Sequence, residues 1–279
     1  MKIKFLGTAA AEGIPALFCK CEICENARKK GGKEIRTRHQ AIVDDKLLID
    51  FNGDTYMHIL NHGLDLTKVH SCIVTHSHFD HLNVADLWCR CRTIANNIEE
   101  IPFSMYLTES GYNMVNEFID KYKEPIEGRV EANKITAFEE FKTEGYTITP
   151  LRAKHDPNST PVIYIIEKDG KTLFYSCDTA VYYEETFEYF KNCKKHFDLI
   201  AIDCTGGLMP QNKNEMSHMC FEDNLYVLDK LAEFGLRDEN TKVVMTHISH
   251  NAHTTHEQLV KAAEEKGFFV AYDGMEIEF

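Results

Sequence analysis

The hydrophobic and polar positions of the chain form a pattern typical of an α/β fold. Short apolar runs bounded by turn residues predict strands, and stretches with apolar side chains every three or four positions predict helices. The predicted strands are residues 2–6, 41–43, 47–49, 72–74, 103–107, 135–138, 146–152, 162–167, 172–176, 197–202, 242–246 and 268–271. The predicted helices are residues 55–61, 82–91, 109–122 and 219–234, with a last one that ends near residue 266. Strands with connecting helices throughout imply layers of helix packed on sheet.

Turn and capping residues mark the ends of several of these elements. Residues 44–46 join two apolar runs as a hairpin, and residues 168–171 join two later strands in the same way. Asp54 is a candidate cap for the helix that follows it. Residues 254–257 have the pattern of a capping box for the last helix.

Nothing in the 279 residues separates the chain into two halves, so we expect one domain over residues 1–279. No Pro-, Gly- or Ser-rich linker, internal repeat or low-complexity tract is visible. The chain begins with a predicted strand rather than a signal peptide, and no apolar run approaches the roughly 18 residues of a membrane span. We therefore expect a cytoplasmic protein that does not bind membranes.

Charge and cysteine content narrow the function classes. The formal net charge of −13 repels phosphate backbones at long range, so nucleic acid is an unfavourable partner without a local basic patch. A small substrate is easier to reconcile with this charge. The ten cysteines come without an export signal, which argues against a disulfide framework. The sequence leaves a homodimer open.

A dense histidine motif follows the apolar run at residues 72–74. It reads His76-Ser77-His78-Phe79-Asp80-His81. Imidazole and carboxylate groups suit first-row divalent metals, Zn²⁺ first among them. The motif places four candidate ligands within six residues, more than one tetrahedral ion with an open position uses, so it predicts two metals. A lone histidine is usually a surface or core residue, but packing and solvation do not explain this clustering.

Three cysteines, Cys19, Cys21 and Cys24, lie close together near the N-terminus. Spacing this tight lets the three sulfurs face one centre, so a Cys₃His zinc site needs one more ligand from elsewhere. A reduced cluster without metal is the alternative, although thiols packed this closely in a reducing compartment are more often metal-binding.

Further candidate ligands follow the ends of predicted strands, and with them the chain resembles a known superfamily. The motif at residues 76–81 matches the HxHxDH signature of the metallo-β-lactamase superfamily, and His155, Asp178 and His247 come in the order that the superfamily uses. The resemblance covers essentially the whole chain. It implies an αββα sandwich, in which two mixed sheets face each other with helices outside and a dinuclear site lies at one sheet edge.

A closer resemblance is to the phosphoribosyl 1,2-cyclic phosphate phosphodiesterase branch, which acts after carbon–phosphorus lyase. That branch has the same Cys-x-Cys-x-x-Cys hook and a histidine three residues beyond the last catalytic one, as at His250. The resemblance implies one metal on His76, His78 and His155. It implies a second metal on Asp80, His81 and His247, with Asp178 as the bridge. Zinc and manganese both suit these ligands.

The same resemblance assigns a structural zinc to the cysteine hook. Its expected ligands are Cys19, Cys21, Cys24 and His250, with His253 as the rival fourth ligand. Such a closed site has no place for water, so its expected role is structural. It would tie the first loop to the turn that carries His247.

The activity implied is that of a metal-dependent phosphodiesterase acting on a small phosphodiester, for which a cyclic one is expected. The two metals would activate a water for in-line attack on phosphorus. His218 is the candidate general acid for the leaving alkoxide, with a helix-surface histidine as the alternative, and Asp80 is counted as catalytic with it. Asp203 is either a partner that orients His247 or a helix cap. Arg36, Arg38 and Arg152 are either anion contacts or solvated surface.

Three other functions compete with this one. A tRNA 3′-processing nuclease uses the same ligand set, but the chain has no long basic insertion or positive balance for a polyanion. Thioester and lactone hydrolases belong to the same superfamily. A non-catalytic protein similar to the pyrroloquinoline-quinone carrier type shares the cysteine hook, but such proteins tend to have eroded ligand sets.

Overall fold

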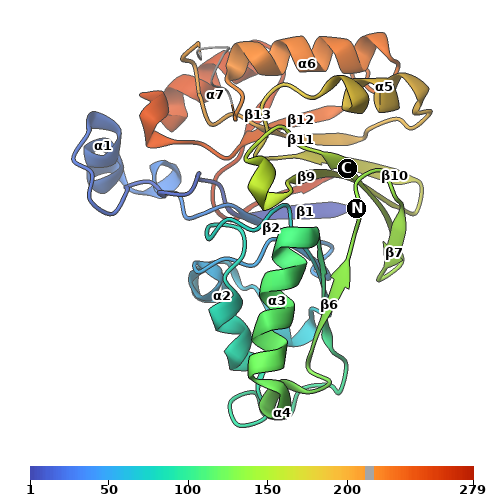
Figure 1. Ribbon diagram of the computed structural model, residues 1–279. Coiled ribbons are helices and arrows are strands. Elements are labelled where there is room, and N and C mark those ends of the chain that lie inside the picture. The colour runs from blue at the N-terminus through green and yellow to red at the C-terminus, as the bar shows by residue number, and fades with distance from the viewer. Residues whose placement is uncertain (211–216) are drawn as a thin grey trace.

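Two seven-stranded sheets lie face to face at the centre of the computed structural model, with helices on both outer sides (Figure 1). The structure describes residues 1–210 and 217–279. The αββα sandwich expected from the sequence is confirmed.

The first sheet contains the N-terminal half of the chain and the last strand. Its strands, in spatial order, are β14 (Met275–Glu278), β1 (Lys2–Gly7), β2 (Gln40–Val43), β3 (Leu47–Ile49), β4 (Ser71–Ile73), β5 (Phe103–Leu107) and β6 (Val130–Lys134). The pairs from β14 to β3 are antiparallel, and those from β3 to β6 are parallel.

The second sheet has the order β13 (Phe269–Val270), β12 (Lys242–Thr246), β11 (Leu199–Asp203), β10 (Lys171–Ser176), β9 (Val162–Lys168), β8 (Tyr146–Arg152) and β7 (Phe141–Thr143). Strands β13 to β10 are parallel, and β10 to β7 are antiparallel. The parallel half matters for function, because the carboxyl ends of β10, β11 and β12 lie at the same edge of the sheet.

Helices lie outside the two sheets. They are α1 (Glu22–Lys30), α2 (Thr55–His62), α3 (Glu109–Lys121), α4 (Lys123–Ile126), α5 (Glu184–Asn192), α6 (Phe221–Glu233) and α7 (His256–Glu264). Short 3₁₀ helices span Gly32–Glu34, Leu66–Lys68, Val84–Arg90, Pro157–Ser159 and His250–Ala252. In Figure 1, α2 and α3 lie on the side of the first sheet, and α5, α6 and α7 lie on the side of the second.

Three apolar layers hold the sandwich together. Between the sheets, Phe5 and Ile49 of the first pack with Tyr164 and Leu173 of the second. A second layer joins β9 to β12 with α5, α6 and α7, and a third joins β4 and β5 with α3. Burial of apolar surface on both faces of each sheet is the main stabilising term. The shared central layer favours the single domain over residues 1–279, which remains a prediction.

The helix predicted at residues 82–91 is wrong in type and start. Leu82 forms a β-bridge with Phe51, so the chain is still extended there. Asn83 then accepts a hydrogen bond from the backbone of Ala85 at 3.2 Å and begins a 3₁₀ helix. Apolar spacing does not distinguish this tighter helix from an α-helix.

The strand predicted at residues 135–138 is also wrong, because the strand lies earlier, at β6. Pairing with β5 ends where the Ile135 amide donates to the Leu107 carbonyl, and Phe138 adopts a φ of 68°. Ile135 is buried in the central apolar layer without belonging to a strand. Its hydrophobicity reflects burial rather than pairing.

The predicted caps are partly wrong. Helix α7 does have a capping box, but Thr255 and Gln258 form it, one position later than predicted. Asp54 precedes α2 without capping it, because its carboxylate binds the backbone and side chain of Arg38. The sequence pattern missed α1, α5, β7 and β14. Among the described residues, none of the helices has the length and apolar character needed to cross a membrane.

Candidate active site

The second sheet brings three predicted site residues to one edge. Strands β10, β11 and β12 are parallel neighbours, so their carboxyl ends lie together. Asp178 follows β10, Asp203 ends β11 and His247 follows β12. Asp178 and His247 have φ angles of 62° and 60°. Non-glycine residues rarely adopt this left-handed conformation, and such strain concentrates at functional sites.

A group of three histidines forms one side of the site. His76 and His78 come from the turn after β4, and His155 follows β8. His76 Nε2 lies 2.9 Å from His78 Nδ1, and His155 Nε2 lies 3.2 Å from the same atom. Each residue thus directs one ring nitrogen to a common point, and the three could hold a metal ion.

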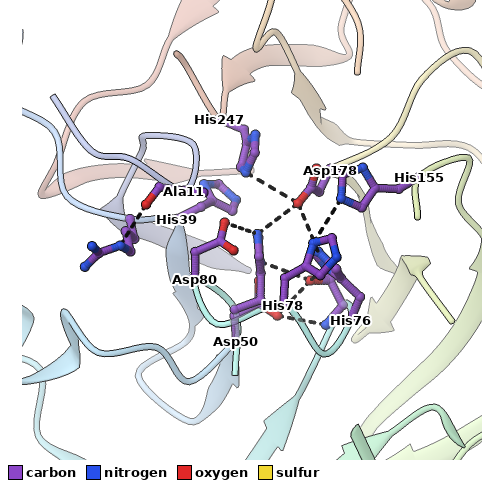
Figure 2. A network of polar contacts seen from close by, with 12 residues as sticks. Ala11, His39, Asp50, His76, His78, Asp80, His155, Asp178 and His247 are labelled. Carbon is purple, nitrogen blue, oxygen red and sulfur yellow. Dashed lines mark hydrogen bonds and ion pairs between the residues drawn. The ribbon is translucent and has the colours of Figure 1, made fainter. Parts of the chain in front are cut away.

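A second group lies beside the first and contains Asp80, His81, Asp178 and His247, which could also hold a metal ion. His81 Nε2 lies 3.1 Å from Asp80 Oδ2 and 3.0 Å from Asp178 Oδ2. Asp178 Oδ2 is also 3.2 Å from His76 Nε2 in the first group. Figure 2 shows the contacts of both groups converging on Asp178. We call the two groups together the catalytic cluster.

The donor atoms of the catalytic cluster fit divalent cations. Within the described part of the chain, His247 Nε2 is buried without a hydrogen-bond partner, and Asp178 Oδ2 lies 3.6 Å from it. A buried unpaired polar atom costs about 1–3 kcal/mol, so this nitrogen calls for a ligand. Imidazole nitrogen and carboxylate oxygen are the donors that zinc and manganese accept.

The pKa values of Asp178 and His76 are shifted towards their metal-binding forms, whereas Asp80 and Asp50 outweigh burial and raise the pKa of His81. Burial opposes ionisation of Asp178, but His247 and His76 outweigh it and hold the pKa of the carboxyl well below its usual range. Burial and the nearby His81 lower the pKa of His76. The ionised carboxylate and the neutral imidazole are the forms that bind metals.

Each histidine of the catalytic cluster has a protein partner on its other ring nitrogen. The pairs are His76 Nδ1 with Thr75 Oγ1 at 3.1 Å, His81 Nδ1 with Asp50 Oδ2 at 2.7 Å, His78 Nε2 with Asp156 Oδ2 at 3.2 Å, His155 Nδ1 with the Ser217 carbonyl at 3.2 Å, and His247 Nδ1 with Thr205 Oγ1 at 2.8 Å. Such partners fix the orientation of a ligating ring and tune its basicity. The sequence did not reveal any of these five partners.

His39 is another residue that the sequence did not single out. It is fully buried, and its ring meets the His247 ring edge-on with centroids 5.4 Å apart. His39 contacts the Tyr175 hydroxyl on one side and lies 3.3 Å from Thr246 Oγ1 on the other. His39 therefore packs against the His247 ring and restricts its orientation.

Asp203 is not the helix cap that the sequence allowed. Its carboxylate accepts hydrogen bonds from the backbone amides of Asp178, Thr205 and Met219 at 3.0–3.1 Å. The direct partner of His247 is Thr205, whereas Asp203 Oδ2 is 3.5 Å from His247 Nδ1. Asp203 therefore acts on His247 chiefly through Thr205.

His218 lies beside the catalytic cluster, as expected for a residue that acts there. Its Nδ1 is 3.1 Å from Asp178 Oδ1 and 3.3 Å from Asp203 Oδ2. Burial disfavours the charged ring, but the two carboxylates outweigh it and raise the pKa of His218 to about 11. The ring packs near His155, with centroids 5.0 Å apart, and lines a cavity.

The cavity has a volume of about 520 Å³ and opens over the catalytic cluster. Its wall includes Ala10, Ala11, Glu12, Ser249 and Asn251. No lysine or arginine of the described residues lines it.

The three candidate arginines lie elsewhere. Arg36 is buried and donates to Thr8 Oγ1 and the Ala271 carbonyl. Arg38 binds Asp54 and the carbonyl of Ala11, and Arg152 pairs with Glu185 on the surface. All three therefore have partners within the protein and are absent from the described wall of the cavity.

The three predicted thiols meet a histidine at a separate place, which we call the thiol cluster. Cys19, Cys21, Cys24 and His250 could hold a metal ion together. His250 Nδ1 lies 3.4 Å from Cys21 Sγ and 3.7 Å from Cys19 Sγ. Burial opposes ionisation of Cys21, but hydrogen bonds from Cys24 and His250 lower its pKa to about 6. A thiolate is the form that binds zinc. His253 is exposed and outside this group.

The family follows from a comparison with family models. A model described as a β-lactamase superfamily domain matches residues 48–248, which is most of the chain. The chain belongs to the β-lactamase superfamily. This confirms the superfamily expected from the motif at residues 76–81. No curated protein matches this β-lactamase superfamily protein significantly.

Solved structures share the fold of this superfamily member. A diphosphatase of the PhnP family is 21% identical, with a TM-score of 0.73, 100% of this chain and 98% of that chain covered. Zn²⁺-bound PqqB from Methylobacterium extorquens is 21% identical, with a TM-score of 0.74 and 100% of both chains covered. The short form of human tRNase Z is 15% identical, with a TM-score of 0.65 and 100% and 99% covered. At these identities the likeness shows the fold alone.

The β-lactamase superfamily protein thus brings every predicted ligand into one of its two clusters. Members of the superfamily are metal-dependent hydrolases. The roles of the single residues, the number of metals and their identity remain predictions.

Proposed function

We propose that this protein is a metal-dependent phosphodiesterase that hydrolyses a small, cyclic phosphodiester. The observation that best supports this proposal is the position of Asp178. Its carboxylate contacts His76 in one ligand group, His81 in the other, and His218 at the cavity wall. Two ligand groups that share a carboxylate and open on one cavity suit attack by an activated water.

The proposed ligands of one metal are His76, His78 and His155, and those of the other are Asp80, His81 and His247, with Asp178 between them. Two divalent ions held there would supply a nucleophilic hydroxide near neutral pH and neutralise the phosphate oxygens. Asp50, Thr75, Asp156 and Thr205 keep the ligating nitrogens directed inward. These contacts hold the geometry before the substrate arrives.

We assign proton donation to His218. Because His218 Nδ1 is within hydrogen-bond distance of Asp178 and Asp203, its other ring nitrogen is left to serve the cavity. The Asp203 carboxylate, which is not among the proposed metal ligands, favours the protonated ring, which is the acid form. His218 then gives a proton to the departing alkoxide.

The charge of the cavity favours a small substrate over nucleic acid. The protein has a formal net charge of −13, and no lysine or arginine lines the described wall of the cavity. A polyanion would need a basic groove along its backbone. A monoanionic diester needs only the catalytic cluster to balance its charge.

The direct test is turnover of ribose 1,2-cyclic phosphate esters and 2′,3′-cyclic nucleotides, with bound metals counted on the same sample. We expect hydrolysis of at least one cyclic diester and about three metals per chain, two in the catalytic cluster and one zinc in the thiol cluster. Full metal occupancy without turnover of any diester would overturn the proposal.

The role of His218 has its own test. His218→Ala is expected to lose at least about tenfold in turnover of an alkyl diester, but little with a p-nitrophenyl ester, because p-nitrophenolate leaves without a proton. His253→Ala is the control, since this histidine is exposed and outside both clusters. A loss below tenfold on the alkyl diester removes His218 from the mechanism.

A non-catalytic role remains the second candidate, because Zn²⁺-bound PqqB has the same fold over its whole length. One zinc per chain, confined to the thiol cluster, would favour it. We also place the protein in the cytoplasm, where a reducing environment keeps three neighbouring thiols available for zinc.

A further inference from the structure

Two sulfurs of the thiol cluster belong to a cysteine pair at the start of a helix. Cys21 immediately precedes α1, and Cys24 lies in the first turn of that helix. Cys24 is fully buried, whereas Cys21 is partly exposed. All ligand atoms of the thiol cluster lie within 4.8 Å of one another, so the two sulfurs are close together. A Cys-x-x-Cys pair at a helix N-terminus is an arrangement in which thiol–disulfide chemistry is common.

The two cysteines can join while α1 stays in place. Ile23 and Ala27 of α1 are buried in the apolar layer beside the second sheet, so packing holds the helix. Helical geometry places the Cα atoms of residues three apart about 5 Å from each other, and this separation suits a disulfide. A bridge from Cys21 to Cys19 would instead span one intervening residue and close a more strained ring.

The other two ligands of the thiol cluster, Cys19 and His250, depend on the cluster for their contact. Leu17 and Phe18, next to Cys19, are 76% and 101% exposed, so this part of the loop gains little from packing. His250 Nδ1 lies 3.7 Å from Cys19 Sγ and 3.4 Å from Cys21 Sγ. A disulfide within the helix pair would leave two of the four zinc ligands, which are too few for a structural site.

His250 connects the thiol cluster to the cavity. It begins a 3₁₀ helix, and its neighbours in the chain, Ser249 and Asn251, both line the cavity. The hydrogen bond from the Ser249 hydroxyl to Glu12 does not involve the thiols and holds the start of the turn. Release of His250 should therefore loosen the cavity wall at residues 250–252.

We propose that Cys21 and Cys24 form a reversible disulfide that expels zinc from the thiol cluster and frees His250, so that the cavity wall responds to oxidants. The oxidant is a hydroperoxide such as hydrogen peroxide. Zinc binding keeps the sulfurs as thiolates, and the thiolate is the reactive form. This inference goes beyond the proposed function, because it rests on zinc in the thiol cluster and not on the phosphodiesterase activity.

The reaction has two steps. The Cys21 thiolate attacks hydrogen peroxide, so that an S–O bond forms, the O–O bond breaks and hydroxide leaves. The Cys24 thiolate then attacks the Cys21 sulfur, so that the S–S bond forms, the S–O bond breaks and a second hydroxide leaves. The two sulfurs lose two electrons, the peroxide gains them, and two protons from the buffer convert the hydroxides into water.

The test exposes the zinc-loaded protein to hydrogen peroxide. We expect release of about one zinc per chain, a bridge between Cys21 and Cys24 in peptide mass spectrometry, and faster amide hydrogen exchange at residues 250–252 but not in β12. A thiol reductant with added zinc should reverse all three changes. In the oxidised protein, kcat/KM for a hydrolysed diester should fall by about tenfold, because a displaced wall misplaces the substrate.

Three variants separate the helix pair from the other thiols. Cys24→Ser should form no bridge, so that Cys21 proceeds to the irreversible sulfinic acid. Cys19→Ser also removes a proposed zinc ligand but keeps the pair, and it should still form the bridge. Cys89→Ser should behave as the wild-type protein, since Cys89 is exposed and belongs to neither cluster.

Two results of the peroxide treatment would overturn the inference directly. In one, peroxide oxidises Cys89 but leaves the zinc bound; in the other, zinc is released and the bridge runs through Cys19. A bridge between Cys21 and Cys24 with unchanged exchange at residues 250–252 also overturns it, because His250 would not be freed. If no diester is hydrolysed at full metal occupancy, the proposed function fails, whereas zinc release, bridge formation and hydrogen exchange still decide this inference.

Discussion

The catalytic cluster and the thiol cluster share one turn but differ in design. His247 serves the first and His250 the second, three residues apart. The catalytic cluster has nitrogen and oxygen donors and opens on a cavity. The thiol cluster has three sulfurs, and none of its residues lines the described cavity wall. Open sites with mixed donors suit catalysis, whereas closed sulfur-rich sites suit structural zinc.

The difference extends to how each cluster is held. The histidines of the catalytic cluster have hydrogen-bond partners from both sheets, so the whole sandwich positions them. The thiol cluster joins residues 19–24 to His250, across most of the chain. Its contribution is to hold a loop against the turn with His247. Removal of one ligand should therefore abolish activity in the first case and loosen the structure in the second.

The largest effect is expected from Asp178→Asn. Asp178 lies within 3.2 Å of donor atoms in both ligand groups, so loss of its charge should weaken both metals and lower turnover by about 10³-fold or more. The zinc of the thiol cluster should remain. Turnover, metal content and circular dichroism measure these effects, with Asp120→Asn on the exposed side of α3 as the control. Near-normal turnover would exclude a bridging role for Asp178.

Cys21→Ser should act on the other cluster alone. It should lower zinc by about one ion per chain and lower the melting temperature, while the catalytic metals remain, because a structural zinc stabilises the fold by its binding free energy. Metal analysis and thermal unfolding measure this. Cys89→Ser is the matched control, since Cys89 is exposed and belongs to neither cluster. Unchanged zinc content would refute the assignment of a zinc site.

The stability of the fold is expected to depend on pH through a buried histidine of α2. His58 is fully buried beside Gln40 and Thr37, and burial lowers its pKa to about 4. The unfolded chain, with an ordinary pKa near 6.5, binds the proton more tightly. The stability contributed is therefore complete above about pH 6.5 and is lost as the pH falls to about 4. Between pH 6.5 and pH 4 the loss in unfolding free energy amounts to about 3 kcal/mol.

Denaturant unfolding of His58→Asn checks this expectation. The slope of the unfolding free energy against pH should fall by up to about 1.4 kcal/mol per unit between pH 4 and 6.5. Some slope should remain, because burial also lowers the pKa of His256 to about 4. An unchanged slope would show that His58 titrates alike in both states.

The motifs in the sequence led to the sandwich through the family resemblance that they carry, and the residues assigned as ligands lie together in the two clusters. Apolar runs located most strands, and the HxHxDH and Cys-x-Cys-x-x-Cys motifs named ligand types at tight spacing. Asp178 and His247 were accessible because side chains that follow parallel strands meet at one edge. The same rule applied to β3 would have found Asp50, which follows that strand directly.

The features missed depend on contacts between distant segments. Thr205 and Asp156 carry no motif, and only the folded chain shows that each faces a histidine ring. Residues 135–138 looked like a strand because three of them are apolar, although only Ile135 is buried and β6 ends before them. The 3₁₀ helix after Asn83 was missed because the bridge between Leu82 and Phe51 is a tertiary contact. Periodicity reports burial more directly than it reports hydrogen bonding.

The smallest effect is expected from Asp156→Asn, which tests whether outer partners tune the catalytic cluster. His78 is the most exposed of the first three ligands, and Asp156 is its partner at 3.2 Å. Loss of the charge should weaken the metal held by His76, His78 and His155 by about tenfold, since changes of such partners cost 10–100-fold. Competition with a chelator measures this affinity. The thiol cluster should be unaffected.

Asp65→Asn is the matched control, because Asp65 and Asp156 each accept a hydrogen bond that begins a 3₁₀ helix. A loss of affinity in Asp156→Asn but not in Asp65→Asn separates the contact with His78 from the shared capping role. Equal affinities in both variants would mean that His76 and His155, packed 4.5 Å and 4.9 Å from the His78 ring, orient it without Asp156. In that case the catalytic cluster would resemble the thiol cluster more closely, because contacts among the ligands themselves, rather than outer hydrogen-bond partners, would position them.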